Sequence, residues 1–170
     1  MSFKVGDKVV LPNHGVTVVE QINETTIGGT CNTFYHLRLL ANDSKVMVPI
    51  DNKERIGLRR LYAKKEIKNL FGLLERKETR ASRDWKDRYR ENLEKMKTGR
   101  LEDVADVLKN LTQISRRKSL SFREKKMYER AKHLLVSEVA IVKGIEEGEA
   151  ENLIERSLDK ALALPASIGH

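Results

Sequence analysis

The clearest alternating stretch of this sequence reads Lys-Val-Met-Val-Pro-Ile at positions 45–50. Because successive side chains of a strand point to opposite faces, its three β-branched residues are predicted to share one face, with Met47 and Pro49 on the other. Proline cannot donate a ladder hydrogen bond, so Pro49 indicates an edge strand or a strand end. Met47 would then be an exposed apolar group on an edge that a partner protein can extend by strand addition.

Short strands separated by turns extend this pattern back to the N-terminus. Three further strands are predicted around Val9-Val10, at 16–27 and at 34–40. Gly28-Gly29, between the second and third of these strands, indicates a hairpin turn and not a phosphate loop, because no helix follows it. Residues 1–60 are therefore predicted to form a small twisted β-barrel.

From Ala63 onward the apolar residues recur with the spacing of helices. The sequence predicts five helices, which carry Ile67 to Leu74, Ser82 to Lys97, Leu101 to Leu111, Ser121 to Val139 and Leu153 to Leu162. Ser82 is the expected N-cap of the second helix, and Gly99 is expected to end it. The predicted fold class is thus α+β, with an all-α helical domain of about five helices at residues 61–170.

The net charge of the chain, +8, is concentrated in its middle third. Residues 1–60 carry a net charge of +2, residues 61–134 carry +10 and residues 135–170 carry −4. Only the middle segment is basic enough to provide a positively charged binding surface for nucleic acid. The first third therefore needs another partner, and a protein is predicted there.

The only tryptophan, Trp85, starts a helical pattern within a basic run that includes Lys86, Arg88 and Arg90. Basic side chains neutralise phosphates, whereas a large ring can insert beside or between bases. The N-terminal amides of a helix also favour phosphate, so the ring and the cations would reach DNA together. A second basic group, around Lys125, would add phosphate contacts.

Each of these features also has a purely structural interpretation. Trp85 shares a helical face with Tyr89, Leu93 and Met96, so a packed core stripe explains it equally well. A solvated face equally explains the later basic residues, which are Lys125, Lys126, Arg130, Lys132 and the cluster Arg116-Arg117-Lys118. Phe122, which precedes them, is expected to pack against the start of its helix.

The sequence predicts no catalytic residues, no metal site and no cofactor. His14, His36 and His133, three of the four histidines, are scattered, and no zinc spacing, phosphate loop or dinucleotide turn is present. Cys31 is the only cysteine, so no intramolecular disulfide can form and a reducing compartment is expected. Without a signal peptide or a membrane span, the chain is predicted to be a soluble cytoplasmic protein.

Several motifs, taken in order, resemble the CarD/CdnL family of bacterial transcription regulators. They are Phe3-Lys4-Val5-Gly6-Asp7, His14-Gly15, Val46 to Ile50, Ile56-Gly57-Leu58-Arg59, Trp85 to Tyr89, Leu93-Glu94-Lys95 and Leu120-Ser121 with Glu124-Lys125. The resemblance implies a Tudor-like N-terminal domain that binds the β subunit of RNA polymerase. It also implies a helical C-terminal domain that touches promoter DNA at the upstream edge of the transcription bubble.

The resemblance also assigns roles to individual residues. Met47 and Pro49 match positions that contact RNA polymerase in the family. Trp85 matches the residue whose ring is inserted as a wedge where the two DNA strands separate. The basic positions near the DNA backbone are matched by Arg88, Arg90 and Lys125. Some members, notably mycobacterial ones, have arginines at the positions of Thr25 and Met47, so polymerase contact here is expected to rely more on strand pairing and apolar surface.

The expected mechanism is stabilisation of the open promoter complex without sequence-specific base reading, by a protein that is monomeric when bound to polymerase. Net activation and net repression both remain compatible with it. Two alternatives stay open on the sequence. The first domain also resembles the polymerase-binding module of the transcription-repair coupling factor, so a polymerase-bound adaptor is one. A generic RNA-binding protein, which would bind free RNA without polymerase, is the other.

Overall fold

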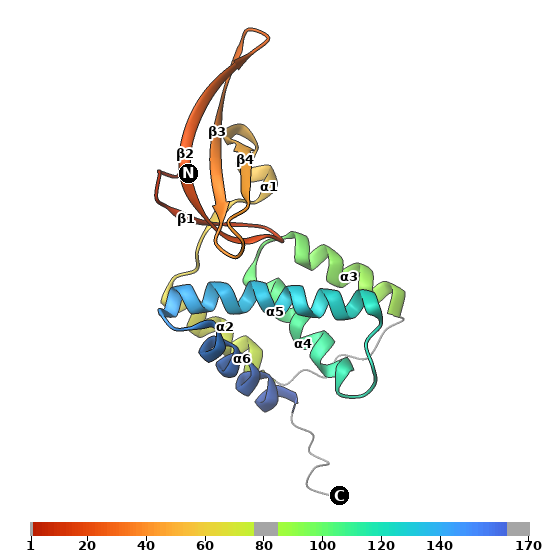
Figure 1. The fold of residues 1–170 in the computed structure, drawn as a ribbon. Helices are drawn as coiled ribbons and strands as arrows, with labels where there is room; N and C mark the ends of the chain where they lie inside the picture. The colour runs from red at the N-terminus through yellow and green to blue at the C-terminus, as the bar shows by residue number, and fades with distance from the viewer. Residues whose placement is uncertain (1, 77–84, 163–170) are drawn as a thin grey trace, which may run out of the picture. The chain divides into compact units, whose positions relative to one another are not determined.

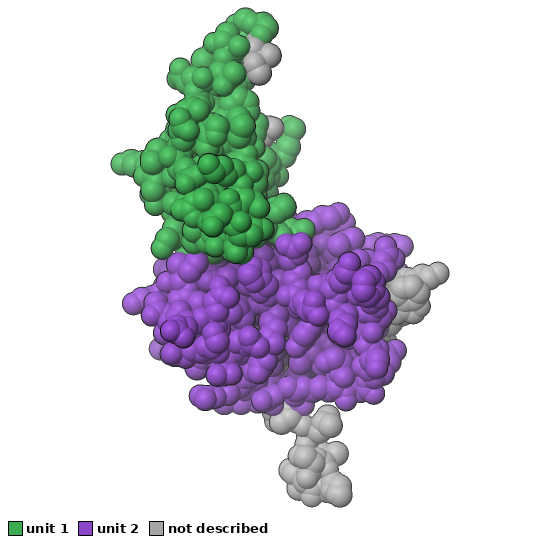
Figure 2. All heavy atoms as spheres, in the orientation of Figure 1, with its two compact units in different colours: residues 1–61 green, residues 62–170 purple. Residues whose placement is uncertain are grey.

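The structure, a computed structural model, describes residues 2–76 and 85–162, apart from the side chains of 27, 52–54, 85 and 86. The chain divides into two compact units, Met1–Leu61 and Tyr62–His170 (Figure 2). This division falls one residue after the boundary placed on the sequence. A sheet forms the first unit and long helices form the second, which confirms the α+β class (Figure 1).

The first unit is built on an antiparallel sheet with the strand order β4-β3-β2-β1-β5 (Figure 1). Its elements are β1 (Lys8–Leu11), β2 (Gly15–Ile27), β3 (Thr30–Leu39), β4 (Lys45–Pro49), a 3-10 turn (Ile50–Asn52), α1 (Lys53–Ile56) and β5 (Arg59–Arg60). The four predicted strands are present, whereas β5 was not predicted because two residues are too few to show alternation. No ladder joins β4 to β5 within the described residues, so the sheet is open at this point, which is compatible with the small twisted barrel that was predicted.

The two faces of β4 are as predicted. Val48 lies opposite Tyr35 in the ladder and is 2% exposed, and Val46 and Ile50 pack against the same core. Met47, on the other face, is 54% exposed. Burial of the alternating apolar residues therefore fixes the register of β4, since a slip by one residue would bring Met47 into the core.

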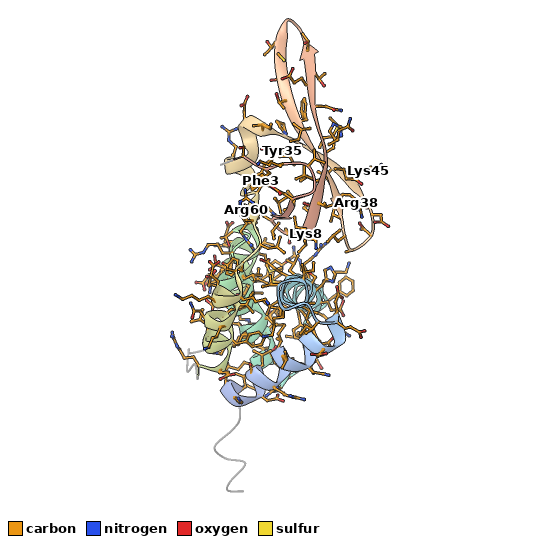
Figure 3. The ribbon with its side chains drawn as sticks, turned by 90° about the vertical axis from the view of Figure 1, so that its left-hand side faces the viewer. Phe3, Lys8, Tyr35, Arg38, Lys45 and Arg60 are labelled. Carbon is orange, nitrogen blue, oxygen red and sulfur yellow. The ribbon has the colours of Figure 1, made fainter. Side chains whose placement is uncertain are left out.

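The N-terminus completes the core of this unit through Phe3 (Figure 3). Its ring centroid lies 5.8 Å from that of Tyr35, and its backbone N–H donates to the Tyr35 hydroxyl at 3.1 Å. The guanidinium of Arg60 covers the other side of the ring, 5.3 Å from its centroid. Tyr35 is thus buried with its hydroxyl satisfied, as a buried tyrosine requires.

Strands β2 and β3 form a long hairpin. Gly28 and Gly29 at its tip have φ values of 58° and 80°, a backbone conformation that glycine adopts at little cost, and the predicted hairpin turn is confirmed. A β-bulge between Val19 and Gln21 leaves Glu20 unpaired in the ladder. The Glu20 carboxylate accepts from Nε of Arg38 at 2.9 Å, which ties the bulge to β3.

The second unit contains the five predicted helices. They are α2 (Lys64–Glu75), α3 (Trp85–Lys97), α4 (Leu101–Ser115), α5 (Phe122–Lys143) and α6 (Glu147–Leu162). Their apolar faces meet in one core, in which Leu70, Leu108 and Leu135 are almost fully buried. Ser121 caps α5 by accepting from the Glu124 N–H, and Gly144 ends it with a φ of 69°. Ser82, the N-cap predicted for α3, lies outside the described residues.

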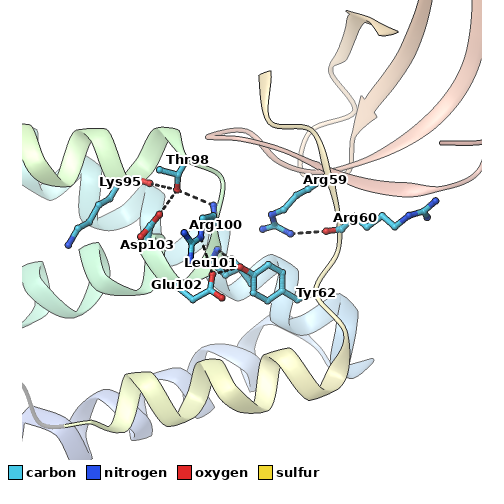
Figure 4. Close-up of polar contacts among 9 residues, drawn as sticks. All are labelled: Arg59, Arg60, Tyr62, Lys95, Thr98, Arg100, Leu101, Glu102 and Asp103. Carbon is cyan, nitrogen blue, oxygen red and sulfur yellow. Dashed lines mark hydrogen bonds and ion pairs between the residues drawn. The ribbon is translucent and has the colours of Figure 1, made fainter. Parts of the chain in front are cut away.

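Tyr62 joins the first turn of α4 to the middle of α5. Its backbone N–H donates to the buried carboxylate of Glu138 at 2.9 Å. Its hydroxyl accepts from the Leu101 N–H at 3.2 Å and donates to Glu102 (Figure 4). Because the N-cap residue of α4, Arg100, makes no side-chain cap, this tyrosine satisfies a helix N–H from 39 residues away.

Acidic residues of α6 pair with basic residues of the neighbouring helices. Lys132 of α5 lies 2.8 Å from Glu151 and 3.0 Å from Glu155. Ion pairs also join Arg116 to Asp159 and Lys160 to Glu75. Partial burial acts to lower the pKa of Lys132, but its hydrogen bonds to the two glutamates outweigh burial and raise that pKa above its ordinary value.

The Lys132 pairing predicts a small dependence of stability on acid. The hydrogen bond from Lys132 lowers the pKa of Glu151 below its ordinary value of 4.5. The contribution of the Glu151 carboxylate to the free energy of unfolding is therefore fully present above pH 4.5. It is lost as the pH falls through the lower pKa that Glu151 has in the folded state. Urea unfolding at pH 7 should show Glu151→Gln to be less stable than wild type by less than about 1 kcal/mol, because the pair is largely exposed. If Glu151→Gln were less stable than wild type by the same amount at pH 7 and in strong acid, this prediction would be wrong.

Candidate nucleic-acid interface

Helix α3, which carries the predicted wedge, is described from Trp85 onward. The side chains of Trp85 and Lys86 lie outside the described part of the structure, so the roles predicted for them at DNA stay predictions.

The apolar stripe predicted along α3 is only partly a core stripe. Met96 is 3% exposed and Tyr89 packs partly against the core, but Leu93 is 38% exposed. The fully buried line of α3 runs instead through Arg88, Asn92 and Met96. Residues on this line are spaced by four, as one helix face requires.

The position of Arg88 in the free protein argues against the predicted contact with the DNA backbone. Arg88 lies on the buried line of α3, and its side chain is 9% exposed. Its Nε and Nη2 lie 3.1 and 3.0 Å from Oε2 of Glu124, which is equally buried in α5. A guanidinium held in this way is turned toward the protein interior, so it is not presented to a phosphate.

Three cations and an aromatic ring are exposed in the parts of α3 and α5 that contact each other through Arg88 and Glu124. Arg90 and Lys125 are exposed, and neither forms an ion pair within the described residues. Phe122 was expected to pack its helix start, but it is 71% exposed. The Nζ atom of Lys126 lies 4.5 Å from its ring centroid. We call Arg90, Phe122, Lys125 and Lys126 the basic-aromatic surface.

Other basic residues of the middle third are engaged elsewhere. Arg116 and Lys132, both considered for the basic face, are ion-paired with α6. Lys109 is buried, and its Nζ donates to the carbonyls of Leu73 and Arg76 at the end of α2. The charge available to a polyanion is therefore smaller than the composition indicates, and part of it is placed where α3 and α5 begin (Figure 1).

The predicted polymerase-binding residues lie on the edge strand and outer face of the sheet in the first unit. Pro49 lies opposite Phe34 in the ladder, and Met47 lies opposite His36. Since β4 pairs only with β3 among the described strands, its other side is a free edge. Thr25 of β2 shares this outer face, because the ladders place it in the same alternation as His36 and Met47.

The described residues hold no group of three or more histidines, cysteines or acidic residues that could bind a metal ion. Among the described helices, none has the length and apolar character needed to cross a membrane.

Two family matches cover almost the whole helical and sheet units. Residues 3–62 match the CarD-like/TRCF RID domain, and residues 69–155, just over half of the chain, match the C-terminal domain of CarD. The chain belongs to the CarD family. A Bacillus subtilis (strain 168) relative, described as a putative transcription factor YdeB, is 29% identical over 150 residues, which are 88% of this chain and 98% of that protein.

Two solved structures resemble the sheet unit of this CarD-family chain. The N-terminal domain of Myxococcus xanthus CarD is 37% identical and covers 35% of this chain and 79% of that one, with a TM-score of 0.31. CdnLNt of Myxococcus xanthus is 43% identical and covers 35% and 84%, also with a TM-score of 0.31. The family is one of transcription factors that interact with RNA polymerase, and it is not an enzyme family.

Proposed function

We propose that this protein binds the β subunit of RNA polymerase through the β4 edge and stabilises the open promoter complex through the starts of α3 and α5. The observation that carries the DNA part is the basic-aromatic surface. There the exposed ring of Phe122 lies against Lys126, and α3, which is described from Trp85 onward, contacts the same end of α5 through Arg88 and Tyr89. An exposed ring beside a cation suits a partner that offers both phosphates and unstacked bases.

The proposed mechanism separates recruitment from DNA distortion. Binding to polymerase raises the effective concentration of the helical unit at one place on the promoter, so weak DNA affinity suffices. Arg90 and Lys125 then position the protein on the backbone without reading sequence. Trp85 occupies the distorted minor groove at the upstream edge of the bubble, a contact that exists only when the DNA is melted and therefore favours the melted state. This activity takes place in the bacterial cytoplasm, at the nucleoid.

The β4 edge supports the recruitment half of the proposal. Its free side offers backbone groups for an added strand, and Met47 and Pro49 with Phe34 provide apolar contact beside them. One copy of the protein would occupy one such site on polymerase, which fits a monomer in the bound state.

The proposal predicts a longer lifetime of open complexes. Complexes of bacterial RNA polymerase on a linear promoter would be challenged with heparin, with and without the protein, and their decay followed. We expect the protein to lengthen the lifetime about tenfold, as a contact worth about 1.4 kcal/mol would do. An unchanged lifetime, combined with tight binding of free RNA in the absence of polymerase, would reject open-complex stabilisation in favour of RNA binding.

A further inference from the structure

The starts of α3 and α5 are joined by two adjacent contacts. The first is the buried ion pair of Arg88 with Glu124. The second lies one residue further along α3 and one residue back along α5, where the Arg123 guanidinium is 4.9 Å from the Tyr89 ring centroid. Two contacts between consecutive residues restrain both the separation and the relative rotation of the helices, which one contact would not do.

Glu124 is held in place from its own helix as well. Its backbone N–H donates to Ser121 Oγ at 3.2 Å, and that hydroxyl lies 3.3 Å from Oε1 of the same glutamate. The other carboxylate oxygen, Oε2, faces Arg88. The N-cap of α5 thus fixes the carboxylate, and the carboxylate fixes the arginine.

A buried ion pair is poorly explained as a source of stability. The cost of removing two charges from water largely cancels their attraction, and apolar replacements of such pairs are often neutral or stabilising. What the pair supplies is a fixed orientation, because two guanidinium nitrogens of Arg88 contact one carboxylate oxygen of Glu124 at the same time. Trp85 lies one helical turn before Arg88, and Lys125 directly follows Glu124.

We propose that Arg88 is a positioning residue, which acts through Glu124 to set the orientation of the Trp85 turn relative to the cations of α5. The inference rests on the proposed function, since the orientation matters only if ring and cations meet the same DNA. Arg88 itself makes no phosphate contact. This role differs from that of Arg90, an exposed arginine two residues further along the same helix.

The test compares the full-length double variant Arg88→Met/Glu124→Met with the matched control Arg90→Met. The double variant removes both charges, so it leaves no unpaired buried ion. Three quantities would be measured: the salt dependence of binding to fork-junction DNA, the emission and iodide quenching of Trp85, and the open-complex lifetime. Since Trp85 is the only tryptophan, its fluorescence reports directly on the environment of the α3 start.

For the double variant we expect an unchanged salt slope, altered Trp85 quenching and a several-fold shorter open-complex lifetime. For Arg90→Met we expect unchanged quenching and a salt slope shallower by about 0.9, the value for one phosphate. A double variant that lowers the slope as Arg90→Met does would show that Arg88 contacts phosphate, and the proposal would be rejected. Unchanged quenching would also reject it.

A charge exchange, Arg88→Glu/Glu124→Arg, provides a second, independent measurement. It reverses the charge at position 88 but keeps an ion pair between the helices. If Arg88 has a positioning role, the open-complex lifetime with the charge-exchange variant should be closer to wild type than the lifetime with Arg88→Glu alone. If Arg88 contacts phosphate, both variants should shorten the lifetime equally. If wild type itself fails to extend the lifetime, the proposed function fails, while Trp85 quenching still decides whether the pair orients α3.

Discussion

Replacing Trp85 by alanine is expected to reduce the lifetime of open complexes about tenfold, to that of polymerase without the protein. The ring would no longer occupy the position beside unpaired DNA, where unstacking costs a few kcal/mol per step. Loss of about 1.4 kcal/mol from a contact made only in the melted state corresponds to a tenfold change. The measurement is decay after heparin challenge at saturating protein, so that recruitment does not limit the result.

The control for this prediction separates the ring from the charge around it. Trp85→Ala should keep the polymerase affinity of wild type in a pull-down and the same salt slope on DNA, because no cation is removed. Trp85→Phe should retain part of the effect, since a smaller ring still stacks. A lifetime equal to wild type for the alanine variant, with folding verified by circular dichroism, would exclude the wedge.

Replacing Met47 by aspartate is expected to weaken binding to the polymerase β subunit by at least about tenfold, or about 1.4 kcal/mol. Met47 is 54% exposed on the free edge strand, so the change disturbs no core in the free protein. At an interface, however, the new carboxylate would be buried without a partner. Binding would be measured by titration of the full-length protein with polymerase.

A matched control for Met47→Asp is available on the same strand and face. Lys45→Gln removes an exposed charge from β4 without adding a buried one, and we expect it to bind polymerase nearly as wild type does. At high protein concentration Met47→Asp should lengthen the open-complex lifetime as wild type does, because only its binding to polymerase is impaired. Trp85→Ala should not lengthen the lifetime at any concentration. Equal binding by Met47→Asp and wild type would place the polymerase contact away from this edge.

Elements with their own periodicity were predictable from the sequence. The long helices other than α3, whose buried line includes Arg88 and Asn92, carry an apolar stripe, and the alternation in β4 is set by residues that bury one face. Strand β5 was missed because its two residues pair with β1 only in the folded sheet. Alternation also says nothing about which strands pair, so the strand order β4-β3-β2-β1-β5 could not be predicted from it.

The candidate site was less predictable, because its residues depend on contacts between distant elements. Arg88 was assigned to DNA from its basic neighbours, yet its partner Glu124 is 36 residues away in another helix. One signal was available: Arg88 is eight residues before the buried Met96 and therefore lies on the same helical face. Nothing in the local sequence could show that Phe122 would remain exposed, since exposure depends on what packs against the first turn of α5.

The acidic residues of α6 give the helical unit an internal separation of charge. Glu151, Glu155 and Asp159 pair with cations of α5 and at the end of α4, whereas Arg90 and Lys125 form no ion pair within the described residues, in the part of the helical unit away from α6 (Figure 1). A body charged in this way has an electric dipole, and the field of a nearby polyanion exerts a torque on it. On the proposed function, helix α6 is therefore expected to help turn that end of the helical unit toward DNA before any contact is made.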